Sequence, residues 1–181
     1  VSVMKQLCGW ICENYEYKDP LTHLKLQKLF FYCYGALMSK DLENELGSEL
    51  LFEAWVHGPV NRELYQLFKT KGSSEILQSE YPSAGSYSKE VSEILKDTIT
   101  VYGVMSAWSL RHQTHTEAPW KSSYEKRKTQ IDNQEMKNYF IEKFKEGEVS
   151  APEYLFGLSS FKVDGVPVQT YQSLASLANV V

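Results

Sequence analysis

The fold of this chain depends on one stretch, Glu53-Ala54-Trp55-Val56-His57-Gly58-Pro59-Val60, in which an apolar run meets a Gly-Pro pair and a helical pattern follows. The apolar run, residues 50–56, is too short for a stable helix and too apolar for a solvated loop. It therefore predicts a buried strand of about 5–6 residues. Pro59 has a fixed φ and no N–H, which suits the first turn of a helix. We predict a strand-to-helix corner that presents His57 to a partner or uses it to cap the turn.

Helical patterns occupy most of the remaining chain up to Phe144. Apolar residues recur there at spacings of three and four, which is typical of one face of an α-helix. The predicted helices cover residues 3–17, 21–40, 60–68, 88–102, 105–112, 117–124 and 132–144. Their predicted N-caps include Asp19, Ser88, Thr116 and Asp132, and Gly103 is predicted to end the fourth helix.

The helix predicted over residues 21–40 is apolar on nearly every side, so we expect it to be the central and most buried helix. Gly35 lies inside it, where glycine costs about 1 kcal/mol of helix stability relative to alanine. That cost predicts that another element passes close to Gly35.

The composition is that of one folded domain. A chain of 181 residues, 43% of them hydrophobic, can bury a full core. The predicted fold class is mainly α, a single helical domain over residues 1–146 with a small β element near residues 50–57. Residues 147–181 carry few charges, and we expect an irregular C-terminal appendage there, in which Asp164-Gly165 favours a tight hairpin.

Composition also limits the compartment and the partners. No apolar run approaches the roughly 20 residues that a membrane span requires, and the first residues show no signal-like apolar block. We therefore expect a cytoplasmic protein with no membrane partner. Three cysteines do not make a disulfide framework. The net charge of −4 argues against nucleic acid as a partner, and no basic recognition helix supports a DNA-binding regulator.

One spacing resembles a metal site, because Cys8-x3-Cys12 and His112-x2-His115 would each supply two ligands from one helix face. The two cysteines lie on the apolar face of the first helix, where free cysteine behaves as a small hydrophobe. Cys33 lies in the most apolar helix, where burial makes a thiol inert. We therefore predict neither a metal nor a cofactor.

The polar residues leave one catalytic alternative open, a hydrolase or metal-dependent enzyme built around His57, His115 and Glu117. Such an enzyme needs these groups to converge in a pocket within hydrogen-bond reach. The chain lacks a Gly-Ser-Gly elbow and a phosphate loop that would supply the rest of a mechanism. A binding protein instead needs an apolar patch with a polar rim, and the stock of four Trp and twelve Tyr favours that class.

Three motifs follow one another in an order known from one family. They are Leu21-Thr22-His23-Leu24-Lys25-Leu26-Gln27-Lys28-Leu29-Phe30-Phe31-Tyr32, then the stretch over 53–60 with Leu64-Tyr65, and then Tyr102-Gly103-Val104-Met105-Ser106-Ala107 running on to Thr114-His115-Thr116-Glu117-Ala118-Pro119-Trp120. Together they resemble the Panacea or SocA-like antitoxin domain, over about residues 1–145.

The resemblance implies a mostly helical bacterial domain, found on phages and other mobile elements, that is not an enzyme. Its members are implied to be antitoxins, which bind and neutralise a toxin encoded beside them. One implied route is delivery of the toxin to the ClpXP protease. The implied partners are thus a co-encoded toxin and, on that route, ClpXP.

The resemblance also marks residues, none of which is implied to be catalytic: Lys25, Gln27, Lys28, Tyr32, Trp55, His57, Gly58, Pro59, Thr114, His115, Glu117, Pro119 and Trp120. Arg111 joins them because it stands where serine- or leucine-like residues are expected in the family. We expect a toxin-contact surface that includes the His57 corner and residues 111–117. The alternative is that about half of the motif residues only hold the fold.

Overall fold

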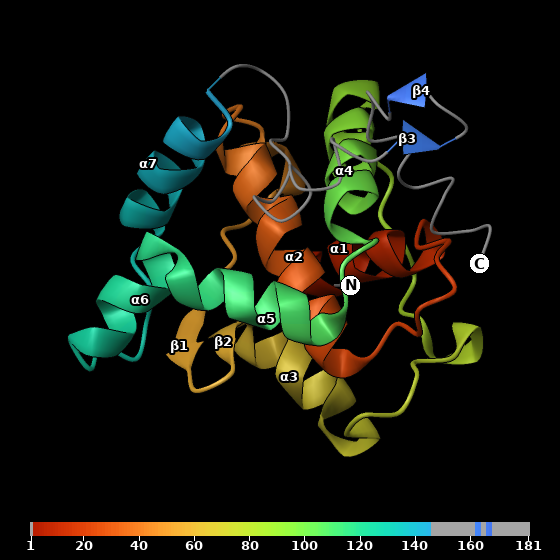
Figure 1. Cartoon of the computed structure of the whole chain (residues 1–181), viewed down its shortest axis with the longest axis horizontal. Helices are drawn as coiled ribbons and strands as arrows, with labels where there is room; N and C mark the ends of the chain where they lie inside the picture. Colours follow the sequence, from red (N-terminus) through yellow and green to blue (C-terminus); the bar gives the residue numbers. More distant parts are fainter. Residues whose placement is uncertain (1, 146–161, 164–165, 168–181) are drawn as a thin grey trace.

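A computed structural model of the chain describes residues 2–145, 162–163 and 166–167, and within them the chain is mainly helical, as predicted (Figure 1). The α-helices are α1 (Val3–Glu13), α2 (His23–Met38), α3 (Arg62–Phe68), α4 (Lys89–Tyr102), α5 (Ala107–Thr116), α6 (Ala118–Glu125) and α7 (Asn133–Lys143). Short 3-10 helices are η1 (Glu43–Leu46), η2 (Lys69–Lys71) and η3 (Gln78–Glu80). Two antiparallel hairpins pair β1 (Glu53–Trp55) with β2 (Gly58–Val60) and β3 (Lys162–Val163) with β4 (Val166–Pro167).

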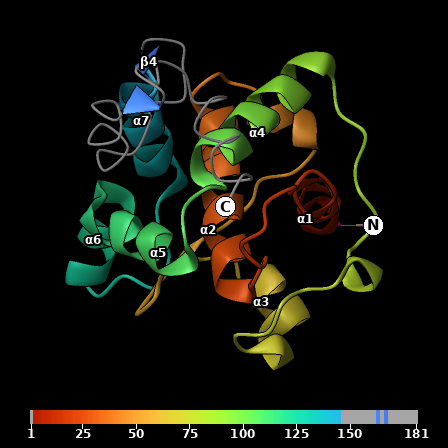
Figure 2. The ribbon, with the colours of Figure 1, turned by 45° about the vertical axis from the view of Figure 1, so that its right-hand side comes forward.

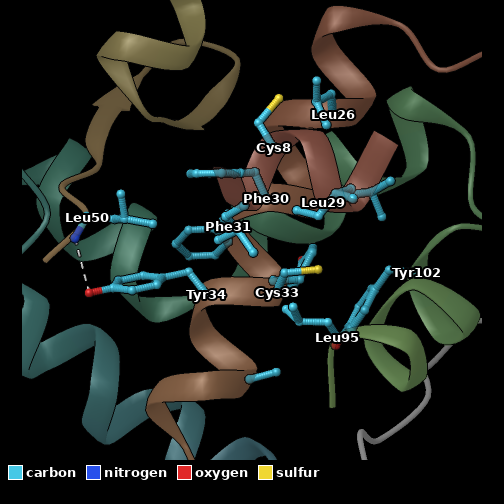
Figure 3. Packing of buried hydrophobic residues seen from close by; sticks show 14 of the residues in the cluster. Cys8, Leu26, Leu29, Phe30, Phe31, Cys33, Tyr34, Leu50, Leu95 and Tyr102 are labelled. Atoms are coloured by element: carbon cyan, nitrogen blue, oxygen red, sulfur yellow. Dashed lines mark hydrogen bonds between the residues drawn. The ribbon is translucent and has the colours of Figure 1, made fainter. Parts of the chain in front are cut away.

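The central helix is α2, as its apolar pattern predicted. Fifteen of its sixteen residues are buried, and only Leu24 is partly exposed. Helices α1, α3, α4, α5 and α7 and strand β2 all contact α2, and Figures 1 and 2 show it enclosed by these elements. Figure 3 shows Phe30, Phe31 and Cys33 of α2 inside the apolar cluster, with α4 contributing Leu95 and Tyr102.

The predicted close approach at Gly35 is confirmed. A Cβ added there would lie 2.2 Å from a ring carbon of Phe140, which α7 places against α2. The Phe140 ring also makes an edge-to-face contact with Phe31, with ring centroids 5.3 Å apart. Glycine is therefore required at position 35 by the space that the Phe140 ring fills.

The predicted corner is wrong in form, because it is a hairpin followed by a separate helix. Pro59 lies in β2, opposite Ala54, and α3 begins only after the N-cap Asn61, whose side chain accepts from the Leu64 N–H. Strand β1 is also shorter than predicted, and Leu51 and Val56 on either side of it are exposed. The single-sequence pattern could not show that residues 58–60 would find a strand partner before the helix began.

Two other boundaries differ from the prediction. Helix α2 begins after Thr22, whose hydroxyl accepts from the backbone N–H of Lys25, whereas Asp19 instead pairs with the Lys25 ammonium. Helix α5 runs to Thr116, so that Glu117, not Thr116, is the N-cap residue of α6. At the first place Asp19 and Thr22 are both favoured N-cap types, so composition does not choose between them. At the second, Glu117 takes the N-cap position without a side-chain hydrogen bond, which residue preference does not predict.

Other sequence predictions are confirmed. Ser88 and Asp132 cap α4 and α7 with their side chains, and Gly103 is the C-cap of α4. Val163 pairs with Val166, as the Asp164-Gly165 pair predicted. Apart from these two short strands, the predicted appendage over residues 147–181 lies outside the described residues. No helix in the described part of the chain is long and apolar enough to cross a membrane.

Candidate functional site

The β1–β2 hairpin places His57 at its turn. The register pairs Trp55 with Gly58, so Val56 and His57 form the connection between the strands. The positive φ of this hairpin falls on Gly58, at 98°, in the region that glycine adopts without strain. A turn followed by a left-handed glycine is a common way to close a short hairpin.

Both outer edges of this hairpin are hydrogen-bonded. On the β1 side, the Ala54 N–H donates to the Thr129 carbonyl (2.8 Å). On the β2 side, Pro59 has no N–H to satisfy, and its outward carbonyl accepts from Lys28 Nζ of α2 (2.8 Å). Pro59 stands opposite Ala54 as a non-hydrogen-bonded pair, in which neither residue donates to the other strand. Proline is tolerated in β2 for that reason.

Gln27 of α2 continues this edge by binding the backbone of Asn61. Its Nε2 donates to the Asn61 carbonyl (3.1 Å), and its Oε1 accepts from the Asn61 N–H (3.0 Å). The Asn61 side chain in turn donates to the Leu51 carbonyl (2.9 Å). One buried amide thus aligns the end of β2 with the start of α3.

Lys28 is fully buried, with 0% of its surface exposed. Burial, and secondarily the charge of Arg111, lowers the pKa of Lys28 to about 7. No carboxylate among the described residues lies within ion-pair distance of Lys28. A buried amino group without a hydrogen-bond partner is costly, and the Pro59 carbonyl supplies that partner.

Helices α5 and α6 fix the opposite side of the hairpin through Trp120. Its indole Nε1–H donates to the Trp55 carbonyl (2.7 Å). The Trp120 ring stacks on His115, with centroids 3.9 Å apart, and on Tyr124, with centroids 4.6 Å apart. Burial lowers the pKa of His115 to about 4, and the charges of nearby basic residues, Arg111 first among them, act in the same direction. This imidazole is therefore neutral at pH 7. The hairpin is held between α2 and α6.

Glu117, at the α5–α6 junction, is a buried carboxylate with several donors. Tyr32 Oη donates to Oε2 (2.9 Å), and Gln113 Nε2 (3.3 Å) and Lys143 Nζ (2.9 Å) donate to Oε1. Only 5% of the Glu117 side chain is exposed. This network joins α2, α5 and α7 at one point, and its partners satisfy the buried charge.

The exposed side of the hairpin turn meets α5. Arg111 Nε donates to His57 Nδ1 (3.1 Å), and its guanidinium lies over the Trp108 ring, 5.4 Å from the centroid. A guanidinium only donates, so His57 Nδ1 accepts, and neutral His57 carries its proton on Nε2. Trp108 is 64% exposed and Val56 is 60% exposed. We call the set Val56, His57, Trp108 and Arg111 the tip face.

The structure thus divides the predicted residues into two groups. The tip face receives only His57 and Arg111. The others are buried or half-buried and support the fold: Lys25, Gln27, Lys28, Tyr32, Trp55, Gly58, Pro59, Thr114, His115, Glu117, Pro119 and Trp120. Among them, Pro119 lies in the first turn of α6, and Lys25 forms an ion pair with Asp19.

Sequence reasoning missed Trp108, Val56 and Lys143. Helical spacing was the available signal for Trp108, because it shares a face with Arg111, three residues on, while Leu110 and Thr114 are buried. Lys143 and Glu117 are 26 residues apart in the sequence, so no local sequence pattern indicates that they pair.

A family model described as antitoxin SocA-like, Panacea domain, matches residues 26–121. The chain belongs to this family. The match begins inside α2 and ends inside α6. The matched residues therefore include the hairpin, the tip face, and Glu117 with its partners Tyr32 and Gln113, whereas Lys143 follows the match and Lys25 precedes it. Neither a curated protein nor a solved structure matches the chain.

The three groups of the enzyme alternative have separate partners. His57 accepts from Arg111, His115 stacks on Trp120, and Glu117 accepts from Tyr32, Gln113 and Lys143. No hydrogen bond joins any two of the three across the described residues. That same part of the chain contains no group of three or more His, Cys, Asp or Glu side chains placed to hold a metal ion.

A first prediction compares alanine at two glycines with similar backbone strain. Gly58 (φ 98°) and Gly47 (φ 91°) both have positive φ, but only at Gly58 is the space for a Cβ filled, by Thr114 Oγ1 at 2.7 Å and Lys28 Nζ at 3.0 Å. Gly58→Ala should therefore lower the free energy of unfolding by about 1–3 kcal/mol more than Gly47→Ala, as overpacking does. Urea denaturation of both variants measures the difference, and equal losses would show that the Lys28–Thr114 packing is loose.

A second prediction concerns the pH dependence of stability. The pKa of Lys28 is about 7 in the folded protein against an ordinary value of 10.5, so between these values the unfolded chain binds more protons. The free energy of unfolding should then rise with pH in this window, by up to about 1.4 kcal/mol per pH unit from this group.

Lys28→Met removes the titrating group and keeps the buried stem. The difference in the free energy of unfolding between wild type and variant should therefore rise with pH at this slope. Urea denaturation at several pH values between 7 and 10 provides the measurement. A difference that is flat across the window would mean that Lys28 keeps its ordinary pKa.

Proposed function

We propose that this Panacea-domain protein is a cytoplasmic antitoxin that binds and neutralises a toxin encoded beside it, using the tip face as its contact surface. Family membership supports the class of function. The observation that carries the contact surface is the exposure of Trp108 beside Arg111 and the His57 turn, on a hairpin whose backbone accepts hydrogen bonds from Lys28 and Trp120.

The tip face has the composition of a binding centre. Trp and Arg are the residues most enriched among those that dominate interface energies. Trp108 and Val56 supply exposed apolar surface, and the hairpin beneath them is fixed by Lys28 and Trp120. A rigid support lowers the entropy lost on binding.

The polar atoms of the tip face are donors. Arg111 has no carboxylate within ion-pair distance among the described residues. Neutral His57 presents its Nε2–H, for which the described part of the chain supplies no acceptor. A toxin surface that supplies carboxylates would complement this face, although the whole chain carries a net charge of −4.

The decisive experiment is co-expression of the chain with the neighbouring gene product, scored by growth rescue and by isolation of the complex. Trp108→Ala should weaken the complex by about 2–4 kcal/mol, as loss of an interface anchor does, and should leave the thermal melting temperature unchanged because Trp108 is mostly solvent-exposed. Leu77→Ala, which removes a side chain that is 54% exposed outside the tip face, is the control.

A neighbouring product that is not toxic, or rescue without any complex, contradicts the antitoxin proposal. A complex that Trp108→Ala leaves intact contradicts only the assigned surface. The resemblance implies sequestration or delivery to ClpXP as routes, and the toxin half-life in cells with and without ClpX separates them.

A further inference from the structure

A pocket of about 410 Å³ opens beside the tip face. It lies between the start of α2, the β1–β2 hairpin, α3 and the end of α6, and Val56 and His57 belong both to its wall and to the tip face. Its size falls in the range of pockets that hold ligands or anchoring side chains.

The walls of the pocket are aromatic and aliphatic. Trp55 and Tyr65 lie with ring centroids 4.7 Å apart, and Tyr65 and His23 continue the wall at 5.4 Å. Leu24, the one partly exposed residue of α2, lines this pocket, and so does the exposed Tyr124. Such walls favour the edge and face contacts of an inserted aromatic ring.

The polar groups at the floor have hydrogen-bond partners within the chain. The Gln27 amide uses its oxygen and its nitrogen on the Asn61 backbone, and Lys28 donates to Pro59. Burial lowers the pKa of His23 to about 4, so its ring is neutral at pH 7. These partnered groups and the aromatic and aliphatic walls together favour an apolar inserted group.

The rim differs from the floor in its charge. Arg111 donates to His57 Nδ1 and approaches the Val56 carbonyl (3.5 Å), so the guanidinium is fixed at the mouth of the pocket beside two wall residues. Arg111 and the His57 Nε2–H are donors with no carboxylate near them among the described residues. A carboxylate outside the pocket would meet both.

We propose that this pocket receives an aromatic side chain of the bound protein partner, next to a partner carboxylate that pairs with Arg111 at the rim. The inference rests on the proposed function, because it names the anchor by which the toxin would be held. It commits to a protein side chain rather than to a free small molecule because the pocket is continuous with the exposed tip face.

One test needs no toxin. The full chain with labelled methyl groups is titrated with N-acetylphenylalanine and, separately, with its uncharged amide, which carries the same ring. The methyl signals of Leu24, Val56 and Val60 should shift with both probes, and the carboxylate should bind about threefold or more tightly than the amide. Arg111→Gln should abolish that preference. Unmoved signals, or equal affinities in the wild type, overturn the assignment.

The second test uses the toxin complex. Leu24→Trp fills the pocket and should weaken toxin binding by about tenfold or more, whereas Leu67→Trp, the same change on α3 outside the pocket, should not. Tyr124→Ala, which opens an exposed wall, provides a second variant should the first fold poorly.

The outcomes separate the inference from the proposed function. Toxin binding that Leu24→Trp and Tyr124→Ala leave unchanged overturns the anchor and spares the antitoxin proposal. A toxin that does not bind the wild type overturns the proposed function. If the probes still bind in that case, the pocket holds a small molecule, and the proposal that it receives a protein side chain is overturned as well.

Discussion

The hydrogen bond from buried Lys28 to the Pro59 carbonyl is the interaction on which the rest of the site depends. Together with the two bonds between Gln27 and Asn61, it lets side chains of a helix take the place of a third strand along β2. This bond gives a partner to a lysine that is buried without a counter-ion, so it favours the observed position of the hairpin relative to α2. Gly58 makes the close approach feasible, because a Cβ at that residue would collide with Thr114.

This constraint explains why most motif residues are inside and few are outside. Tyr32, Glu117 and Lys143 join three helices, and Trp120 binds the Trp55 carbonyl, so these residues position the hairpin without reaching solvent. Substitutions on exposed positions usually change stability little. A tip face built on so rigid a base can therefore be altered at Val56 or Trp108 without loss of the fold, which suits a scaffold that has to match a particular partner.

Sequence periodicity predicted the helices, the central place of α2 and the crowding at Gly35, because these features follow from local spacing and from the cost of glycine. It placed Pro59 in a helix because the register that makes a proline harmless in β2 is set by Ala54 and Thr129, which no local pattern connects to it. The spacing of Trp108 from Arg111 indicates a shared helical face, but a tryptophan by itself fits either the core or the surface of a short helix. The Glu117 network and the pocket join residues distant in sequence, and only the fold brings them together.

The most direct test of the proposed contact surface is hydrogen–deuterium exchange of the chain alone and in complex with the co-encoded toxin. Binding should slow exchange in peptides that cover the hairpin turn, residues 55–58, and the first two turns of α5, residues 107–113. Exchange in α4, on another side of α2, should not change. Protection confined to α4 or α1, with the turn and α5 unaffected, would contradict the claim that the tip face is where this Panacea domain meets its toxin.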